Sequence, residues 1–221
     1  RVAVWEFIVV FEILLFVLMG AAAAQASPGP SLVAVATAAI SGGRQAAFCV
    51  TLGISSGILF WGIAIALGLG SLIQTHPVFL TLMKGVGGGY LLWLALKGLK
   101  AAIEGKQFDV TETNAAISPF AYWKHGLFVV LTNPKAVLMW SAVASFLFGS
   151  GFNSWQVLAF GPALATTAFI IYGSYGLLFS TGTIGRGLQR FSRVINVVLG
   201  TVFGAQGASL LVDVWKSSRP V

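Results

Sequence analysis

Two short motifs interrupt long apolar stretches of this 221-residue chain with proline and polar residues. They are Ser27-Pro28-Gly29-Pro30 and Thr132-Asn133-Pro134-Lys135. Proline lacks a backbone N–H and pushes the preceding residue out of the α region, so each motif predicts a broken helix. We expect Ser27 to be the N-cap before Pro28, the first residue of the new helix. Asn133 and Pro134 predict the same arrangement at the second break. The N–H groups that begin each new helix, at its positive dipole end, can bind an anion such as a carboxylate.

Lys135 places a positive charge beside the second break. It lies 12 residues into the apolar stretch that begins at Trp123, near the middle of a membrane span. A charge at that depth costs about 2.5–3.5 kcal/mol, which favours a functional role. Lys135 could bind a carboxylate or act as a conformational switch. Alternatively, it pairs with a membrane carboxylate for structural reasons, or its long stem extends to an interface.

Other polar residues within the apolar stretches are weaker candidates. Glu12 could pair with Lys135, carry a proton or bind a substrate ammonium, or it could lie in an outer vestibule without a role in transport. Gln25 is a second candidate for the coupling or ammonium-binding role. Gln25, Asn196 and Gln206 all need hydrogen-bond partners, which neighbouring helices can supply. The deeper aromatic residues are expected to pack, although a Tyr hydroxyl could serve a cavity: Tyr90, Trp93, Trp140, Tyr172 and Tyr175.

The composition excludes several classes of protein. Apolar residues make up 57% of the chain and charged residues 9%, whereas an average soluble domain has about a quarter charged residues. A water-soluble domain and a disordered chain are therefore excluded. The net charge of +7 comes from residues scattered between apolar stretches, which indicates membrane topology and no nucleic-acid partner. With one cysteine, two distant histidines and no nucleophile–base set, we expect no metal site, no cofactor and no enzyme activity.

The elements that must position the two motifs are membrane-spanning helices, each needing about 20 apolar residues. The first apolar stretch would be about 54 Å long as one helix, against a hydrocarbon core of about 30 Å, so the first motif must break it. The sequence predicts an all-α membrane protein with six transmembrane helices, of which helices 1 and 4 are broken. The six stretches are 5 to about 40, 46–73, 78–99, 123–148, 155–181 and 194–215.

The two breaks indicate an internal duplication within one membrane domain, 1–221. Pro28 and Pro134 are 106 residues apart, and Gly98 and Gly207 keep a similar offset of 109. Because each repeat holds three helices, the second repeat must be inverted relative to the first. We expect repeat A at about 5–100, a cytoplasmic link at about 101–121 and repeat B at about 122–216. Matching broken helices in inverted repeats are typical of a transporter's central binding site.

The positive charges predict the orientation. Eight of the thirteen Lys and Arg residues fall on the side of the central link and four on the other. The side with eight should be cytoplasmic, so that both termini lie outside.

The order and spacing of the motifs resemble the LysE/RhtB family of bacterial amino-acid exporters. The residues that carry the resemblance are Ser27-Pro28-Gly29-Pro30, Gly42-Gly43, Gly53, Gly57, Gly68-Leu69-Gly70, Lys84-Gly85, Gly89-Tyr90-Leu91-Leu92-Trp93-Leu94, Ser118-Pro119-Phe120, Gly126 and Asn133-Pro134-Lys135-Ala136. The resemblance implies an inner-membrane carrier, often a homodimer, that exports amino acids in exchange for protons. It also implies that Pro28–Pro30 and Asn133–Lys135 form the central site. The sequence is less typical after residue 180.

The function predicted is secondary active export of an amino acid or close derivative by alternating access. Because Glu12 is the only clear acidic candidate in the pathway, we expect a neutral or zwitterionic substrate. Two alternatives stay open: an ion or metal permease of the same architecture, and a membrane scaffold that transports nothing.

Overall fold

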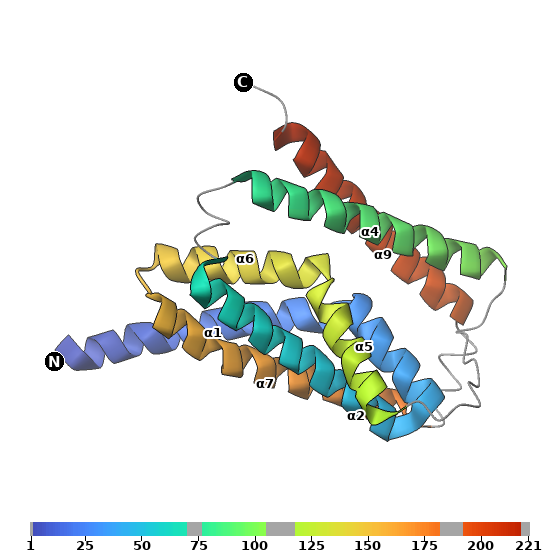
Figure 1. Ribbon diagram of the computed structural model, residues 1–221, viewed down its shortest axis with the longest axis horizontal. Coiled ribbons are helices and arrows are strands. Elements are labelled where there is room, and N and C mark those ends of the chain that lie inside the picture. Colours follow the sequence, from blue (N-terminus) through green and yellow to red (C-terminus); the bar gives the residue numbers. More distant parts are fainter. Residues whose placement is uncertain (1, 70–76, 105–117, 182–191, 218–221) are drawn as a thin grey trace.

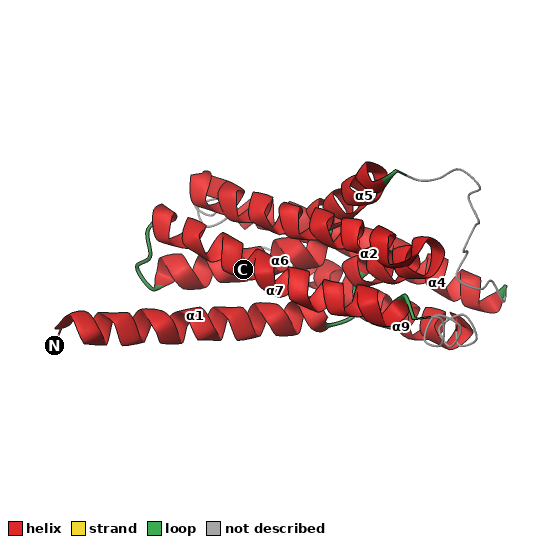
Figure 2. Cartoon of the chain, turned by 90° about the horizontal axis from the view of Figure 1, so that it is seen from below, coloured by secondary structure: helices red, strands yellow, loops and turns green. Residues whose placement is uncertain are grey.

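The computed structural model describes residues 2–69, 77–104, 118–181 and 192–217. Every regular element in these ranges is a helix, which agrees with the predicted all-α class (Figure 2). The elements are α1 (Val2–Ala26), α2 (Pro30–Ala64), the π-helical turn η1 (Ile65–Leu69), α4 (Pro77–Ile103), α5 (Pro119–Leu131), α6 (Pro134–Gly149), α7 (Ser154–Phe179) and α9 (Ser192–Ser217). Most of the link expected at 101–121 lies outside the described residues.

Both predicted helix breaks are present. The first separates α1 from α2, and the second separates α5 from α6, whose axes are bent by 58°. Asn133 is the N-cap of α6 and Pro134 its first residue, as predicted. The predicted cap at Ser27 is wrong. Gly29, in extended conformation, is the N-cap of α2, because Pro30 rather than Pro28 begins that helix. Ser27 instead continues the last turn of α1, its N–H bonded to Ala23 O at 3.1 Å.

The part of the first predicted span after its break and most of the second predicted span are joined in one long helix, α2, which is bent between them. Gly43 has φ 70° and ψ −162°, a left-handed conformation that glycine adopts without steric strain. This bend lies between the expected end of the first span near residue 40 and the expected start of the second at 46. The predicted boundary is therefore a kink rather than a loop.

The main core forms where α2 packs against α5 and α7, with α1 packed on α7 and α6 beside them. Glycines let α2 and α5 approach closely. A Cβ on Gly126 would collide with the backbone of Val50, and one on Gly53 with the backbone of Trp123. Small residues at such contacts are typical of membrane helix pairs, because they allow the backbones to touch.

Helices α4 and α9 form a pair on one side of the other helices (Figure 1). Their backbones meet at Gly88 and Gly207, and Lys84 forms an ion pair with Asp213 at 3.2 Å. The pair contacts the rest of the described protein mainly through α6. One contact is between Gly87 of α4 and Pro134 at the second break.

Three helical stretches of the described chain are long and apolar enough to cross a membrane: Pro30–Gly68, Ser154–Phe179 and Arg193–Ser217. The bent pair α5 and α6 makes a fourth if it counts as one span. The structure therefore supports a multi-pass membrane protein. Six spans in two inverted repeats remain a prediction.

Candidate functional site

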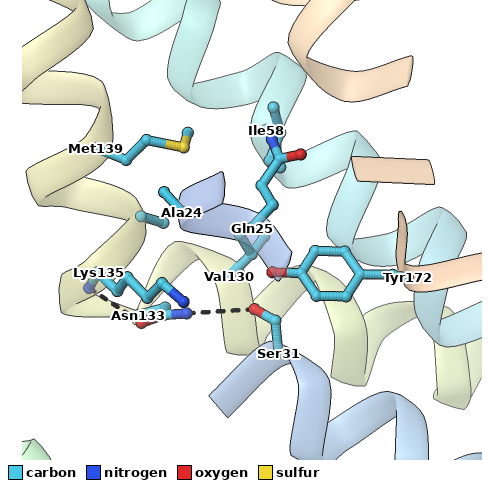
Figure 3. A pocket seen from close by; sticks show the side chains of 10 residues that line it. Ala24, Gln25, Ser31, Ile58, Val130, Asn133, Lys135, Met139 and Tyr172 are labelled. Carbon is cyan, nitrogen blue, oxygen red and sulfur yellow. Dashed lines mark hydrogen bonds between the residues drawn. The ribbon is translucent and has the colours of Figure 1, made fainter. Parts of the chain in front are cut away.

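The two helix breaks meet inside the protein, although more than 100 residues separate them in sequence. The Lys135 ammonium donates to the carbonyl oxygen of Ser27 at 2.7 Å and to its hydroxyl at 2.6 Å. The Asn133 amide donates to the hydroxyl of Ser31 at 3.2 Å (Figure 3). The structure thus brings together Ser27, Asn133 and Lys135, three residues that the sequence predicts to form the site.

The local sequence of the second break fixes the start of α6. The side chain of Asn133 accepts a hydrogen bond from the N–H of Lys135 at 3.0 Å, and its carbonyl accepts from Ala136 and Val137. Pro134 has no N–H, and the N–H of Lys135 is bonded to Asn133, so few backbone donors in the first turn of α6 lack a partner. Lys135 therefore starts from a rigid backbone, and its side chain reaches across to the end of α1.

The start of α2 differs in this respect. Its N-cap, Gly29, has no side chain to accept from the helix, and Pro30 has no N–H. Ser31 and Leu32 follow, at positions whose N–H groups have no carbonyl partner within a helix. Of the two breaks, the first is therefore the one that offers backbone donors and an uncapped dipole end to an anion.

No carboxylate of the described residues neutralises the charge of Lys135. Its partners at Ser27 are neutral oxygens, and the ion pairs of the described residues are Lys84–Asp213 and Lys100–Glu104. An ammonium has three donors, and Ser27 takes two of them. The half-buried cation can therefore accept an anionic ligand without first losing its present partners.

A pocket lies beside this cation, between α1, α2, α6 and α7 (Figure 3). Its cavity volume is about 20 Å³, which is room for roughly one water molecule, and it is partly open to the outside. An amino acid can therefore bind here only if the lining side chains or helices move apart. Its lining combines polar and apolar side chains: Ala24, Gln25, Ser31, Ile58, Val130, Asn133, Lys135, Ala136, Met139 and Tyr172.

Gln25 lines the pocket and also anchors α1 to α7. Its amide donates to the carbonyl of Leu164 at 3.2 Å, and its oxygen accepts from the Thr167 hydroxyl at 3.0 Å. The Tyr175 hydroxyl donates to the carbonyl of Ala26 at 2.9 Å. The partners that the sequence requires for a buried glutamine are thus supplied by a neighbouring helix.

Sequence reasoning missed Ser31 as a site residue and expected Tyr172 to pack. Ser31 is buried, and the Tyr172 hydroxyl points toward it across the pocket (Figure 3). The only sequence signal that Ser31 belongs to the site was its place in the first turn after Pro30. The corresponding signal for Tyr172 was a hydroxyl group deep in an apolar stretch.

The prolines and Gly29 shape the site without contributing polar groups. Pro28 is exposed, Pro30 is buried, and buried Pro134 packs against Gly87 of α4. Gly29 lies directly against Lys135, since a Cβ built on it would be 3.3 Å from the ammonium nitrogen. Its missing side chain leaves room for the lysine head group.

The structure does not bring Glu12 to this site. Glu12 is exposed on α1, and 15 residues of helix place it about 22 Å along the axis from Ser27. It is not among the residues that line the pocket, and it forms no ion pair with Lys135.

Comparison with known proteins extends this description. The LysE type translocator family matches residues 22–214, almost the whole chain. A threonine efflux protein of Escherichia coli is 29% identical over 85% of this chain and 91% of its own. A leucine efflux protein of Salmonella choleraesuis is 30% identical, covering 83% of this chain and 87% of its own. An uncharacterized membrane protein of Haemophilus influenzae is also 30% identical, covering 85% of this chain and 90% of its own.

No solved structure matches the chain. The family match includes both helix breaks, the pocket and the α4–α9 pair. It agrees with the resemblance carried by the two proline motifs. The chain belongs to the LysE family of translocators.

Proposed function

We propose that this protein is a secondary transporter that exports amino acids from the cytoplasm. One observation carries the proposal: the Lys135 ammonium, which has no carboxylate partner among the described residues, lies beside a pocket where two broken helices meet. A cation at such a place needs an anionic ligand to offset the loss of its hydration. The relatives named for threonine and leucine efflux support an amino-acid carboxylate as that ligand.

The substrate we propose is a neutral, zwitterionic amino acid. Its carboxylate would contact the Lys135 ammonium and the N–H groups at the start of α2. Its ammonium would face the oxygens of Gln25, Ser31 and Tyr172. No Asp or Glu is among the pocket-lining residues, so the pocket offers no charged partner for a basic side chain.

Transport would proceed by alternating access, with the two inverted repeats rocking about the site. The contacts of the α4–α9 pair support this symmetry. Gly98 packs against Asn196, and Gly207, its counterpart at an offset of 109, packs against Gly88. The counterpart of Asn196 at the same offset is residue 87, next to Gly88. Exchanging the two repeats therefore turns the Gly98–Asn196 contact approximately into the Gly207–Gly88 contact, as expected for repeats related by symmetry.

The remaining parts of the proposal are proton coupling, assembly as a homodimer within bilayer lipid, and termini on the outer side. Within the pocket, Gln25 is the better placed of the two ammonium-binding candidates. Glu12, exposed on α1, remains a candidate for proton uptake outside the pocket.

Counterflow in proteoliposomes tests the function. Purified protein is reconstituted with one unlabelled amino acid inside, and uptake of the labelled amino acid is measured for threonine, leucine, homoserine and lysine. We expect exchange of the neutral amino acids and its loss in Lys135→Gln. Lys84→Gln is the matched control, because it removes a lysine already paired with Asp213.

The same preparation separates the alternatives. Flux of monovalent or divalent cations without amino-acid exchange would support an ion permease. The described residues hold no group of three His, Cys, Asp or Glu side chains that could bind a metal ion. If the protein shows no flux of amino acids or ions, and no tested metabolite raises its melting temperature, the result would support a scaffold and contradict the proposal.

A further inference from the structure

A second cavity lies on the other side of Lys135, between α6 and the α4–α9 pair. It is a widely open cavity with a volume of about 480 Å³. We call it the α9 chamber. Its lining residues are Leu91, Lys135, Leu138, Ala205, Gln206, Ser209 and Leu210. Lys135 is the residue that this chamber shares with the pocket of Figure 3.

Two polar side chains of α9 line the chamber opposite Lys135. Gln206 and Ser209 are three residues apart and therefore lie on one face of the helix. Gln206 is near the middle of α9, in a stretch apolar enough to span a membrane. Within the described residues, neither side chain has a hydrogen-bond partner, in contrast to Gln25.

Helix packing does not account for these two groups. A polar side chain in a membrane span usually bonds to a neighbouring helix, and leaving it without a partner is unfavourable. Gln206 is partly buried and Ser209 is exposed, and both line the open cavity. A ligand or water in the chamber would supply the missing partners.

The position of Lys135 connects the two spaces. Its four-carbon stem is flexible, so the ammonium that now contacts Ser27 can turn toward the chamber without movement of α6. The rigid start of α6, fixed by Asn133 and Pro134, would be the pivot. Pro134 contacts Gly87, so the same break also touches the α4–α9 pair.

We propose that the α9 chamber is a second binding station for the amino acid, with Lys135 shared between the two. In the chamber Lys135 holds the carboxylate, while Gln206 and Ser209 hydrogen-bond the ammonium or a short polar side chain. The amino acid would pass from one station to the other as the Lys135 side chain rotates from the pocket to the chamber. This inference rests on the proposed function, because it assumes an amino-acid substrate.

Access to a cysteine in the chamber tests the proposal. Cys49 is the only cysteine of the chain, so Cys49→Ser gives a cysteine-free background. Ser209→Cys is then treated with a charged methanethiosulfonate in proteoliposomes, with and without threonine or leucine. Ala208→Cys is the matched control, since Ala208 is exposed on the same helix but does not line the chamber.

The expected result is modification of Ser209→Cys that a transported amino acid slows at least about tenfold, with no modification of Ala208→Cys by the charged reagent. Two results would overturn the proposal. The cysteine could react only with a membrane-permeant maleimide, which would show a chamber filled by lipid. Alternatively, its modification could be unaffected by amino acids in a variant that still exchanges them.

A transport measurement keeps the test independent of the cysteine variant. Gln206→Leu should raise the KM for amino-acid exchange at least about tenfold. Thr201→Val, which removes a hydroxyl bonded to Val197 on the same helix, should leave KM unchanged. If Lys135→Gln loses exchange while Gln206→Leu keeps the wild-type KM, the chamber proposal fails and the proposed function stands. If the wild-type protein exchanges no amino acid, the proposed function fails, and the chamber proposal fails with it.

Discussion

The ammonium of Lys135 bonds both oxygens of Ser27, a residue 108 positions earlier in the chain. This contact joins the end of α1 to the start of α6, and the Asn133–Ser31 bond joins α6 to the start of α2. These hydrogen bonds therefore connect the two breaks directly. A substrate carboxylate bound to the third donor of Lys135 would contact the residue that joins the two breaks, which would couple binding to movement of the broken helices.

Gly29→Ala should weaken substrate binding without unfolding the protein. Gly29 has an extended backbone that alanine also adopts, but its added methyl group would lie 3.3 Å from the Lys135 nitrogen. The methyl group takes space beside the ammonium, where we place the carboxylate, so the KM for exchange should rise about tenfold. Gly20→Ala on α1, where nothing lies within 4 Å, is the control. Equal KM values for both variants would argue against a carboxylate at this position.

The Asn133→Asp variant should still form α6 but should not transport amino acids. Aspartate caps a helix as well as asparagine does, so the melting temperature should change little. The new carboxylate would lie beside Lys135 and compete with the substrate, and we expect affinity to fall at least about tenfold.

The control for this variant is Asn153→Asp. Asn153 is the N-cap of α7, with a complete capping box, far from the pocket lining. Thermal unfolding and counterflow are measured for both variants. Normal exchange by a folded Asn133→Asp protein would show that the lysine charge does not bind the substrate.

Gly126→Ala should destabilise the protein itself. The added methyl group would collide with the backbone of Val50, and backbone cannot move aside as a side chain can. Overpacking of this kind costs about 1–3 kcal/mol, which should lower the melting temperature in detergent by several degrees. Gly173→Ala has open space around it and should melt like the wild type. An unchanged melting temperature for Gly126→Ala would contradict the close contact of α2 and α5.

The sequence was sufficient to predict the breaks, because proline acts through its own backbone chemistry. Pro30 and Pro134 are the first residues of α2 and α6, and Asn133 caps α6; these features depend on local sequence and not on the packing of distant segments. The family could also be predicted, because the two motifs and their order resemble it, and the family match covers residues 22–214.

Contacts across the fold could not be predicted in the same way. The cap at Ser27 was wrong because two prolines compete for the same helix start, and local rules do not decide between them. Glu12 was a reasonable partner for Lys135 by charge alone, yet the length of α1 keeps it away. Ser31 and Tyr172 meet in the pocket only because α2 packs against α7.

The proposed transport depends most on recognition of a carboxylate by Lys135, which a binding measurement with matched ligands tests directly. Purified wild-type protein and Lys135→Gln are titrated with threonine and with threonine amide, and thermal stabilisation is recorded. We expect threonine to stabilise the wild-type protein and threonine amide to stabilise it little. Neither ligand should stabilise Lys135→Gln. Equal stabilisation of the wild type by threonine and its amide, or stabilisation of Lys135→Gln by threonine as strong as that of the wild type, would contradict it.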